Sequence, residues 1–407
     1  MQLRKFKRIF EYAREHSEFY REIYTKAGVM DLDIKTWDDV EKVPVIDKEL
    51  MRKYSLKSQC TMPIERSSIV RCSTSGSTGE PFQLAYSKFA NIAAYLRVFY
   101  IMRKEAKYTP FKKLCILSKY EVNDTFKVEQ NISILKTLQD RIGIFSRRII
   151  SVYEDRETIA NKLKRYNPDV LYSSSSAVEI VANYIVETNQ TMHIPNIILI
   201  AEPVSKNQYE KFKAVFGAKV IDIYGAKESP SIGYEVNKNG RYNIFPNSNI
   251  CQFINIHNTE CGSKGTVVVT NLINYVQPFI RYNLKDYADI INDEKFGVNQ
   301  IGPIVGRISD ILTFPDGNKL FHYGISQRFI DFHYAAQYKF LQVDDGPIIL
   351  QILPVQGIAD AIVISDAQSR WSKSYSKYHL EIQIVDHFDI DKKTGKFKSV
   401  INIKISS

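Results

Sequence analysis

Strand-like and helix-like segments alternate between residues 147 and 225, and this alternation limits the possible folds more than any other feature of the sequence. The β-rich segments are 147–153, 169–175, 196–203 and 218–225, and the segments with helical periodicity are 157–167, 177–189 and 207–217. Short connections between alternating strands and helices predict βαβ units and a parallel sheet. Ligands of such sheets bind at the carboxyl ends of the strands. We therefore expect ligand contacts from Ala201–Pro203 and Tyr224–Glu228, which follow two of these strands.

The rest of the chain divides into an N-terminal helical part, a β-rich part and a smaller C-terminal unit. Apolar residues at helical spacing near the N-terminus include Phe6, Ile9, Phe10 and Ala13. Residues 265–273 and 280–290 have the pattern of strands with turns. From about Ser309 we expect a separate α/β unit of roughly 100 residues, a common domain size. The chain has 407 residues, and we predict two domains, 1–308 and 309–407.

The composition is that of a globular protein, with 44% hydrophobic and 25% charged residues. No run approaches the ~18 uninterrupted apolar residues of a membrane-spanning helix, and we expect neither a membrane span nor a secretory signal. Five irregularly spaced cysteines favour a reduced, cytoplasmic setting over a disulfide framework. The net charge of +10 fits either an anionic ligand or a solvated basic surface. No nucleic-acid-binding motif is present, so no nucleic-acid partner is expected.

The segment from Arg71 to Phe82, RCSTSGSTGEPF, is the strongest local signal. Its glycines, Gly76 and Gly79, can adopt positive φ, which lets successive backbone N–H groups point at one anion. Serine and threonine hydroxyls add further donors, so the segment is suited to holding a polyphosphate. It is not a Walker A loop, because Glu80 stands where that motif has lysine. The alternative is a flexible surface linker.

Five motifs in sequence order, together with the N-terminal segments SEFYREIYTKAG and WDDVEKVPVIDKELMRK, resemble those of the adenylate-forming superfamily. The motifs are STSGSTGEP (73–81), DIYGAKES (222–229), PFIRYNLKDYADI (278–290), GRISDIL (306–312) and KTGKFKSV (393–400). The similarity is greatest to the phenylacetate–CoA ligase branch, including relatives from capsular-polysaccharide gene clusters. The resemblance spans nearly the whole chain.

The resemblance implies an α/β fold with a large N-terminal adenylation domain, in which helices flank parallel or mixed sheets, and a small mobile C-terminal α/β domain. It implies an enzyme that uses ATP and Mg²⁺ to activate a carboxylic acid as acyl-AMP, releasing pyrophosphate. The acyl group would then pass to an acceptor. Coenzyme A is the first expectation, and an acyl carrier protein, an amine or a hydroxyl compound is the alternative. A non-catalytic nucleotide- or acyl-binding protein on the same scaffold also stays open.

The resemblance also assigns roles to individual residues. Lys396 and Glu228 are the expected catalytic residues together with Thr78, and Glu228 is the expected Mg²⁺ ligand. The expected nucleotide-binding residues are Ser73, Thr74, Ser75, Gly76, Ser77, Thr78, Gly79, Ala201, Glu202, Pro203, Asp222, Tyr224, Gly225, Asp286 and Arg307. In the family, the lysine that corresponds to Lys396 offsets the negative charge that gathers between the carboxylate and the α-phosphate.

The residue types fit these roles. The Tyr224 ring offers a flat face for adenine, and the Glu228 carboxylate suits Mg²⁺. The Asp286 carboxylate can accept hydrogen bonds from ribose hydroxyls. Arg307 can donate to ribose or phosphate oxygens, and a mobile cation such as Lys396 lowers the barrier by acting in the transition state.

Each assignment has a structural alternative, namely a core tyrosine, a solvated loop glutamate, a surface ion pair or a basic turn. Asp289 is an alternative to Asp286 as the ribose ligand, and Lys392, Lys393 and Lys398 are alternatives to Lys396.

Two features depart from known patterns. The family usually has glycine before the ribose-binding aspartate, and this chain has Lys285 there. Cys251, His257 and Cys261 lie within eleven residues, but two thiols and one imidazole at this spacing match no common zinc pattern. We therefore expect buried thiols and a loop histidine at these positions, with a structural metal site as the alternative.

Overall fold

The computed structural model describes most of the chain. The described residues are 1–73, 82–118, 146–202, 204–259, 262–291, 297–307, 311–317, 319–321, 325, 329, 332–344, 346–355, 357–388 and 400–403. Within them, no helix combines the length and the apolar character needed to cross a membrane.

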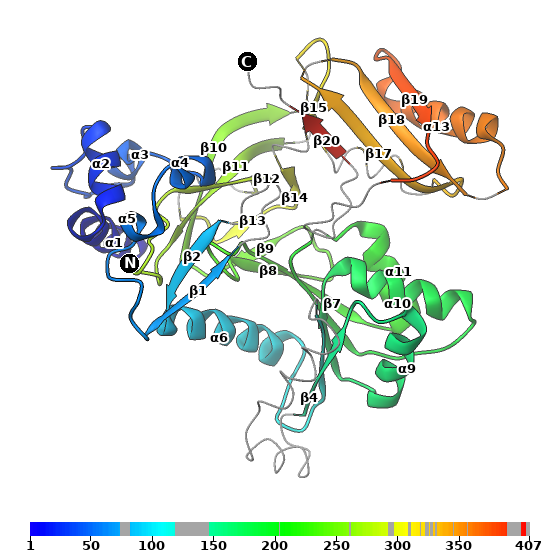
Figure 1. The fold of residues 1–407 in the computed structure, drawn as a ribbon, viewed down its shortest axis with the longest axis horizontal. Helices are drawn as coiled ribbons and strands as arrows, with labels where there is room; N and C mark the ends of the chain where they lie inside the picture. Colours follow the sequence, from blue (N-terminus) through cyan, green and yellow to red (C-terminus); the bar gives the residue numbers. More distant parts are fainter. Residues whose placement is uncertain are drawn as a thin grey trace.

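The largest sheet has eight strands in the order β13-β9-β8-β7-β6-β5-β3-β4 (Figure 1). Its parallel strands are β3 (Leu114–Ser118), β4 (Arg147–Ser151), β5 (Val170–Ser173), β6 (Asn196–Leu199) and β7 (Lys219–Tyr224). The antiparallel extension beyond β7 consists of β8 (Gly233–Val236), β9 (Tyr242–Ile244) and β13 (Gln300–Ile301). The parallel sheet predicted from residues 147–225 is confirmed, and the sheet as a whole is mixed.

Helices cover both faces of this sheet. Successive residues of a strand point to opposite sides, so each strand can pack against the helices on both faces. The helices are α9 (Arg156–Tyr166), α10 (Ser175–Glu187) and α11 (Lys206–Phe216) on one face and α6 (Lys88–Glu105) on the other (Figure 1). Ile197 and Leu199 of β6 pack in the core formed with α9, α10 and α11. Ile198 lies between them and packs with Ile101 and Met102 of α6. Strands covered on both faces need apolar residues throughout, and all four residues of β6 are buried.

Local signals fix the ends of these helices. Ser205 forms a capping box with Gln208 at the start of α11, and Gly217 ends the helix with a φ of +65°. The Asp155 side chain accepts a hydrogen bond from the backbone N–H of Thr158 at the start of α9. These caps satisfy backbone groups that a helix leaves unpaired at its ends.

The N-terminal helices pack on a second, antiparallel sheet. The helices are α1 (Gln2–His16), α2 (Glu18–Lys26), α3 (Trp37–Lys42), α4 (Lys48–Arg52) and α5 (Leu56–Gln59). The sheet has the order β10 (Asn249–Thr259), β11 (Gly262–Asn271), β12 (Tyr282–Asp289) and β14 (Ile304–Arg307). Phe6, Ile9, Phe10 and Ala13 of α1 are fully buried, as their helical spacing predicts, and share a core with residues of β10, β11 and β12.

A short hairpin lies beside these elements. It consists of β1 (Ile69–Ser73) and β2 (Gln83–Ser87), and its register pairs Ser73 with Gln83. The end of this hairpin therefore carries the serine- and glycine-rich segment, of which residues 74–81 lie outside the described residues.

The C-terminal unit has its own sheets and core. Its elements are β15 (Ile311–Thr313), β16 (Lys319–Phe321), β17 (Ala335–Val343), β18 (Ile348–Pro354), α13 (Asp360–Tyr375), β19 (Leu380–Ile384) and β20 (Val400–Ile403). The larger sheet has the order β19-β18-β17-β20, and α13 packs on it through buried residues such as Trp371, whose ring stacks on Phe340 (Figure 1). This core extends from Leu312 to Val400. The domain boundary between residues 308 and 309 stays a prediction.

Candidate active site

The first expected ligand segment follows β6, and its glutamate caps a helix. A Glu202 carboxylate oxygen accepts hydrogen bonds from the backbone N–H of Ser176, at 3.1 Å, and from the Ser175 hydroxyl, at 3.4 Å. Both donors lie at the start of α10, where a carboxylate is stabilised by the helix dipole. Ala201 has a φ of +66°, a backbone conformation that non-glycine residues rarely adopt. The nucleotide-binding roles of Ala201 and Glu202 stay predictions, and Pro203 lies outside the described residues.

The second expected segment follows β7 and contacts the antiparallel sheet. The Tyr224 hydroxyl donates to Oδ2 of Asp286 at 3.0 Å, and both residues are buried. Two residues expected to bind the nucleoside, 62 positions apart in sequence, are therefore in direct contact. Asp286 lies on β12 opposite Arg307 on β14. Nothing is described of the Arg307 side chain, so its predicted donor role rests on this backbone position.

Gly225 and Asp222 support Tyr224 from either side. A Cβ on Gly225 would lie 2.7 Å from the backbone nitrogen of Ser231, so this turn excludes a side chain. The Asp222 carboxylate accepts a hydrogen bond of 2.5 Å from the Tyr242 hydroxyl, and the Tyr242 ring packs against Tyr224 at 5.8 Å between centroids. The Asp222 carboxylate thus contacts Tyr242, and its direct binding of a nucleotide stays a prediction.

Because the Asp222 carboxyl is buried, we expect it to make the stability of the fold depend on pH. Removal from water raises the pKa of this carboxyl to about 6, although the Tyr242 hydroxyl and the Lys238 ammonium oppose the shift. The folded-state pKa thus exceeds the ordinary value of 3.8, so the folded protein binds the proton more tightly than the unfolded chain does. The stabilising contribution is complete below the ordinary value and is lost as the pH rises through about 6.

Asp222→Asn should therefore be more stable than the parent protein at neutral pH, by up to about 3 kcal/mol, with the gain fading toward pH ~4. The asparagine oxygen can still accept from Tyr242. The thermal unfolding midpoint of both proteins, measured across this pH range, checks the prediction. Two curves that stay parallel would show that Asp222 does not carry this pH dependence.

Glu228 is held by a tyrosine from the other sheet. The Tyr282 hydroxyl donates to Oε1 of Glu228 at 3.0 Å, and the Asn271 side chain donates to its backbone carbonyl at 3.2 Å. Burial raises the pKa of Tyr282 well above its ordinary value, so the phenol stays a proton donor. Within the described part of the chain, no hydrogen bond to Oε2 of Glu228 occurs. One carboxylate oxygen is thus fixed in place by a tyrosine of the other sheet.

A lysine joins this loop to the end of the β1–β2 hairpin. The Lys227 ammonium donates to the backbone carbonyl of Ser73. On the far side of the hairpin end, the Lys48 ammonium lies over the Phe82 ring, 5.8 Å from its centroid. One flank of the serine- and glycine-rich segment, Ser73, is therefore bonded to the loop that carries Glu228, and the other flank, Phe82, contacts α4. The predicted roles of Thr74 to Gly79, including Thr78, fall outside the described residues.

Lys285, which replaces the glycine usual in the family, shows why glycine is suited to this position. Its φ is +59°, in the left-handed region. Its ammonium pairs with Asp47, at 3.2 Å, and with Glu49. The backbone strain that the side chain introduces is thus accompanied by two ion pairs to the N-terminal segment.

We expect Lys285→Ala to lower stability more than Lys285→Gly does. Both variants lose the partly exposed ion pairs, which contribute at most about 1 kcal/mol. Alanine keeps a Cβ in the left-handed conformation, and glycine removes that cost of about 1–2 kcal/mol. Thermal unfolding of the two variants and of Glu49→Gln separates the contributions. Equal midpoints for the alanine and glycine variants would contradict the backbone explanation.

The remaining expected catalytic residue and the cysteines add little to this geometry. Lys396 lies in 389–399, outside the described residues. Cys251 is fully buried on β10, and burial raises the pKa of its thiol to about 12. Among the described residues, no group of three or more His, Cys, Asp or Glu side chains is arranged to hold a metal ion.

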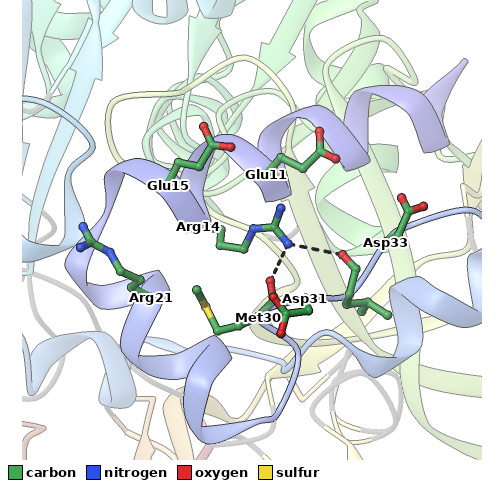
Figure 2. A pocket seen from close by; sticks show the side chains of 8 residues that line it. Glu11, Arg14, Glu15, Arg21, Met30, Asp31 and Asp33 are labelled. Atoms are coloured by element: carbon green, nitrogen blue, oxygen red, sulfur yellow. Dashed lines mark hydrogen bonds between the residues drawn. The ribbon is translucent and has the colours of Figure 1, made fainter.

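A hollow of about 600 Å³ lies elsewhere, on the N-terminal helices (Figure 2). Arg14 projects into it and donates to the backbone carbonyls of Met30 and Leu32. Acidic side chains surround it, among them Glu11, Glu15 and Asp33. None of the expected site residues lines this hollow.

Comparisons with known proteins show similarity in sequence and in fold. No protein-family model matches the chain. Protein CapK of Staphylococcus aureus is 22% identical over 376 residues, which cover 87% of this chain and 78% of CapK. A phenylacetate-coenzyme A ligase of Aromatoleum evansii is 22% identical over 426 aligned positions, covering 99% of this chain and 93% of the ligase.

Solved ligases share the fold. A 2-hydroxyisobutyryl-CoA ligase in the postadenylation state, in complex with R3-HIB-AMP, superposes with a TM-score of 0.73 at 18% identity, covering 99% of this chain and 89% of the ligase. The chain is similar over nearly its whole length to adenylate-forming ligases. Among adenylate-forming ligases, an anthranilate CoA ligase in complex with anthranoyl-AMP is a more remote match, with a TM-score of 0.58 at 14% identity over 80% of this chain and 64% of the ligase.

Sequence reasoning missed two residues of the candidate site. Tyr282 lies in the RYNLKD motif, four residues before Asp286, but its contact with Glu228 joins residues 54 positions apart. Tyr242 has no motif around it. The signal for Tyr282 was its place in the motif, whereas no sequence signal indicated Tyr242.

Proposed function

We propose that the protein uses ATP to activate a carboxylic acid as acyl-AMP and then transfers the acyl group to coenzyme A. One observation carries the proposal: Glu228 and Asp286, expected to bind the metal and the ribose, are each held by a tyrosine hydroxyl at 3.0 Å where β7 meets β12. The hairpin that bears the serine- and glycine-rich segment joins this point through Lys227. Adenylates bound to the similar ligases support the assignment.

The described residues have the chemical groups needed to bind a nucleotide together with Mg²⁺. Carboxylate oxygen is a preferred ligand of Mg²⁺, and Glu228 offers one oxygen while Tyr282 fixes the other. Mg²⁺ bound there would neutralise phosphate charge. The Asp286 carboxylate can accept from ribose hydroxyls while the Tyr224 hydroxyl fixes its orientation. Residues Ser73 to Gly79 would supply the backbone and hydroxyl donors for the phosphates.

In the first step, a carboxylate oxygen of the acid attacks the α-phosphorus of ATP, and the bond to pyrophosphate breaks. Lys396 balances the negative charge that develops between the two reacting groups. In the second step, the thiolate of coenzyme A attacks the acyl carbon, and AMP leaves. In the first step one P–O bond forms as another breaks, and in the second a C–S bond forms as a C–O bond breaks. The main contribution of the protein is therefore to position the reactants and to balance their charge.

The C-terminal unit is proposed to rotate between the two steps and so remove Lys396. One ligase supports this proposal, since its solved structures include a postadenylation state and a thioesterification state with coenzyme A. This chain superposes on the first with a TM-score of 0.73 and on the second with 0.60. The arrangement of the chain is thus nearer to the postadenylation state.

A pyrophosphate-release screen tests the function. Aryl, fatty, hydroxy and amino acids are each supplied with ATP and Mg²⁺, with and without coenzyme A. We expect release with a subset of acids and formation of the acyl thioester when coenzyme A is present. If acyl-AMP accumulates in the presence of coenzyme A but reacts with a carrier-protein thiol, an amine or a hydroxyl compound, that compound would replace coenzyme A as the proposed acceptor. ATP binding without pyrophosphate release from any acid would indicate a non-catalytic protein.

A further inference from the structure

Helix α6 exposes a row of large apolar side chains on the side turned away from the core. The exposed fractions are 70% for Phe89, 55% for Ile92, 68% for Tyr95, 59% for Leu96, 40% for Phe99 and 48% for Tyr100. Their spacing of three and four residues places them on one side of the helix. Ala90, Ile101 and Met102 face the core instead. The helix lies along the lower edge of the molecule in Figure 1.

The exposed charged residues at the two ends of this row are basic. Lys88 lies at the start of the helix, and exposed Arg103, Lys104 and Lys107 lie at and just beyond its end. The helix has a single acidic residue, Glu105, whose side chain is 17% exposed and pairs with Lys219, at 3.1 Å, and with Lys104, at 3.8 Å. Phe111, 74% exposed, follows the helix and adds a further apolar group beside these cations. The α6 face, defined as Phe89 to Tyr100 with its basic ends, is therefore apolar in the middle and cationic at both ends.

This charge pattern selects among the possible occupants. A second copy of the helix packed antiparallel would bring Lys88 next to Arg103 and Lys104, and a parallel copy would bring each basic end next to itself. Both arrangements place like charges together. An anionic lipid surface instead offers negative charge to every cation and an apolar layer to the side chains between them. Tyrosine rings such as Tyr95 and Tyr100 also suit the boundary between headgroups and acyl chains.

We propose that the α6 face docks the protein on an anionic lipid surface. Phe89, Ile92 and Leu96 enter the boundary between headgroups and acyl chains, and the helix lies in the plane of that surface. The row from Phe89 to Tyr100 is about 16 Å long at the rise of an α-helix. Lys88 and Arg103 contact anionic headgroups at its two ends. The binding is peripheral, and it does not depend on the proposed reaction.

Co-sedimentation of the full-length protein with vesicles tests the docking. Phosphatidylcholine vesicles are compared with vesicles that also contain phosphatidylglycerol, at low and high salt. We expect at least about tenfold stronger binding to the anionic vesicles, weakened by salt. The double variant Phe89→Ser/Leu96→Ser should lose at least about tenfold in binding, because two large apolar groups no longer leave water. Lys88→Glu/Arg103→Glu should lose the preference for anionic vesicles.

The matched control uses a different helix. Ile180 and Val186 of α10 are 47% and 58% exposed, and Ile180→Ser/Val186→Ser should leave vesicle binding unchanged. Equal binding to neutral and anionic vesicles, or equal losses in the two serine pairs, would overturn the proposal. A dimer in solution that Phe89→Ser/Leu96→Ser abolishes, without vesicle binding, would assign the face to a second copy. A lower unfolding temperature of that variant, without vesicle binding, would show that the protein itself covers the face.

Discussion

Lys396→Ala should lower acid-dependent pyrophosphate release by about 10²–10³-fold while ATP binding persists. The expected loss is large because the ammonium acts on charge that develops in the transition state, so its removal raises the barrier more than it weakens ground-state binding. Initial rates with a saturating acid give the change in turnover. Calorimetry with ATP checks that the nucleotide still binds.

Two controls separate the role of Lys396 from the effects of a nearby cation and of misfolding. Lys398→Ala removes a nearby cation without removing the lysine that follows Gly395, and it should retain most of the activity. If the proposed rotation withdraws Lys396 before thioester formation, Lys396→Ala supplied with ready-made acyl-AMP and coenzyme A should form the thioester at nearly the parent rate. A similar loss in both half-reactions would point to misfolding. Unchanged pyrophosphate release would remove the assignment of Lys396.

Glu228→Gln is expected to reduce turnover by about 10–100-fold and to raise the Mg²⁺ concentration needed for half-maximal rate. The substitution keeps the size of the side chain, and its amide oxygen can still accept from the Tyr282 hydroxyl. The charge of the proposed metal ligand is therefore lost while its position is preserved. A Mg²⁺ titration of pyrophosphate release measures both effects.

Tyr282→Phe separates the position of Glu228 from its charge. The carboxylate remains, but the hydrogen bond that fixes it at 3.0 Å is lost. Because a hydrogen bond to a charged group contributes about 1.5–3 kcal/mol, we expect a shift of about tenfold in the Mg²⁺ requirement. Tyr54→Phe is the matched control, since it removes a tyrosine hydroxyl that donates to the 48% exposed Glu22, outside the candidate site. A normal Mg²⁺ profile for Glu228→Gln would assign the metal to another residue.

The sequence alone predicted the parallel sheet correctly because its signals are local. The strand that contains Ile197, Ile198 and Leu199 is apolar on both faces, and capping residues such as Ser205 and Gly217 mark the ends of the helix that follows it. The helical face of α1 was predictable for the same reason. Each of these elements is specified by residues a few positions apart.

The contacts within the candidate site could not be predicted in this way. Tyr282 and Glu228 belong to different sheets, and only the packing of the sheets brings them together. The hydrogen bond from Tyr242 to Asp222 depends in the same way on the antiparallel turn from β7 through β8 to β9. The sequence could propose Asp286 and Tyr224 as two ligands of one nucleotide. It could not show that one side chain orients the other.

The first half of strand β12, which carries both Tyr282 and Asp286, is held by contacts with the segment 40–49. Arg281, just before the strand, donates to the carbonyls of Val40, Glu41 and Val43. The backbone of Ile46 hydrogen-bonds with Arg281 and Asn283, and Asp47 and Glu49 pair with Lys285.

These hydrogen bonds and ion pairs therefore let the segment support a strand more than 230 positions away in sequence. A protein shortened to begin after Glu49 would keep every residue proposed to touch the nucleotide. It would nevertheless lose the contacts that hold the strand bearing Tyr282 and Asp286, so the proposed nucleotide site depends on the N-terminal segment for its geometry.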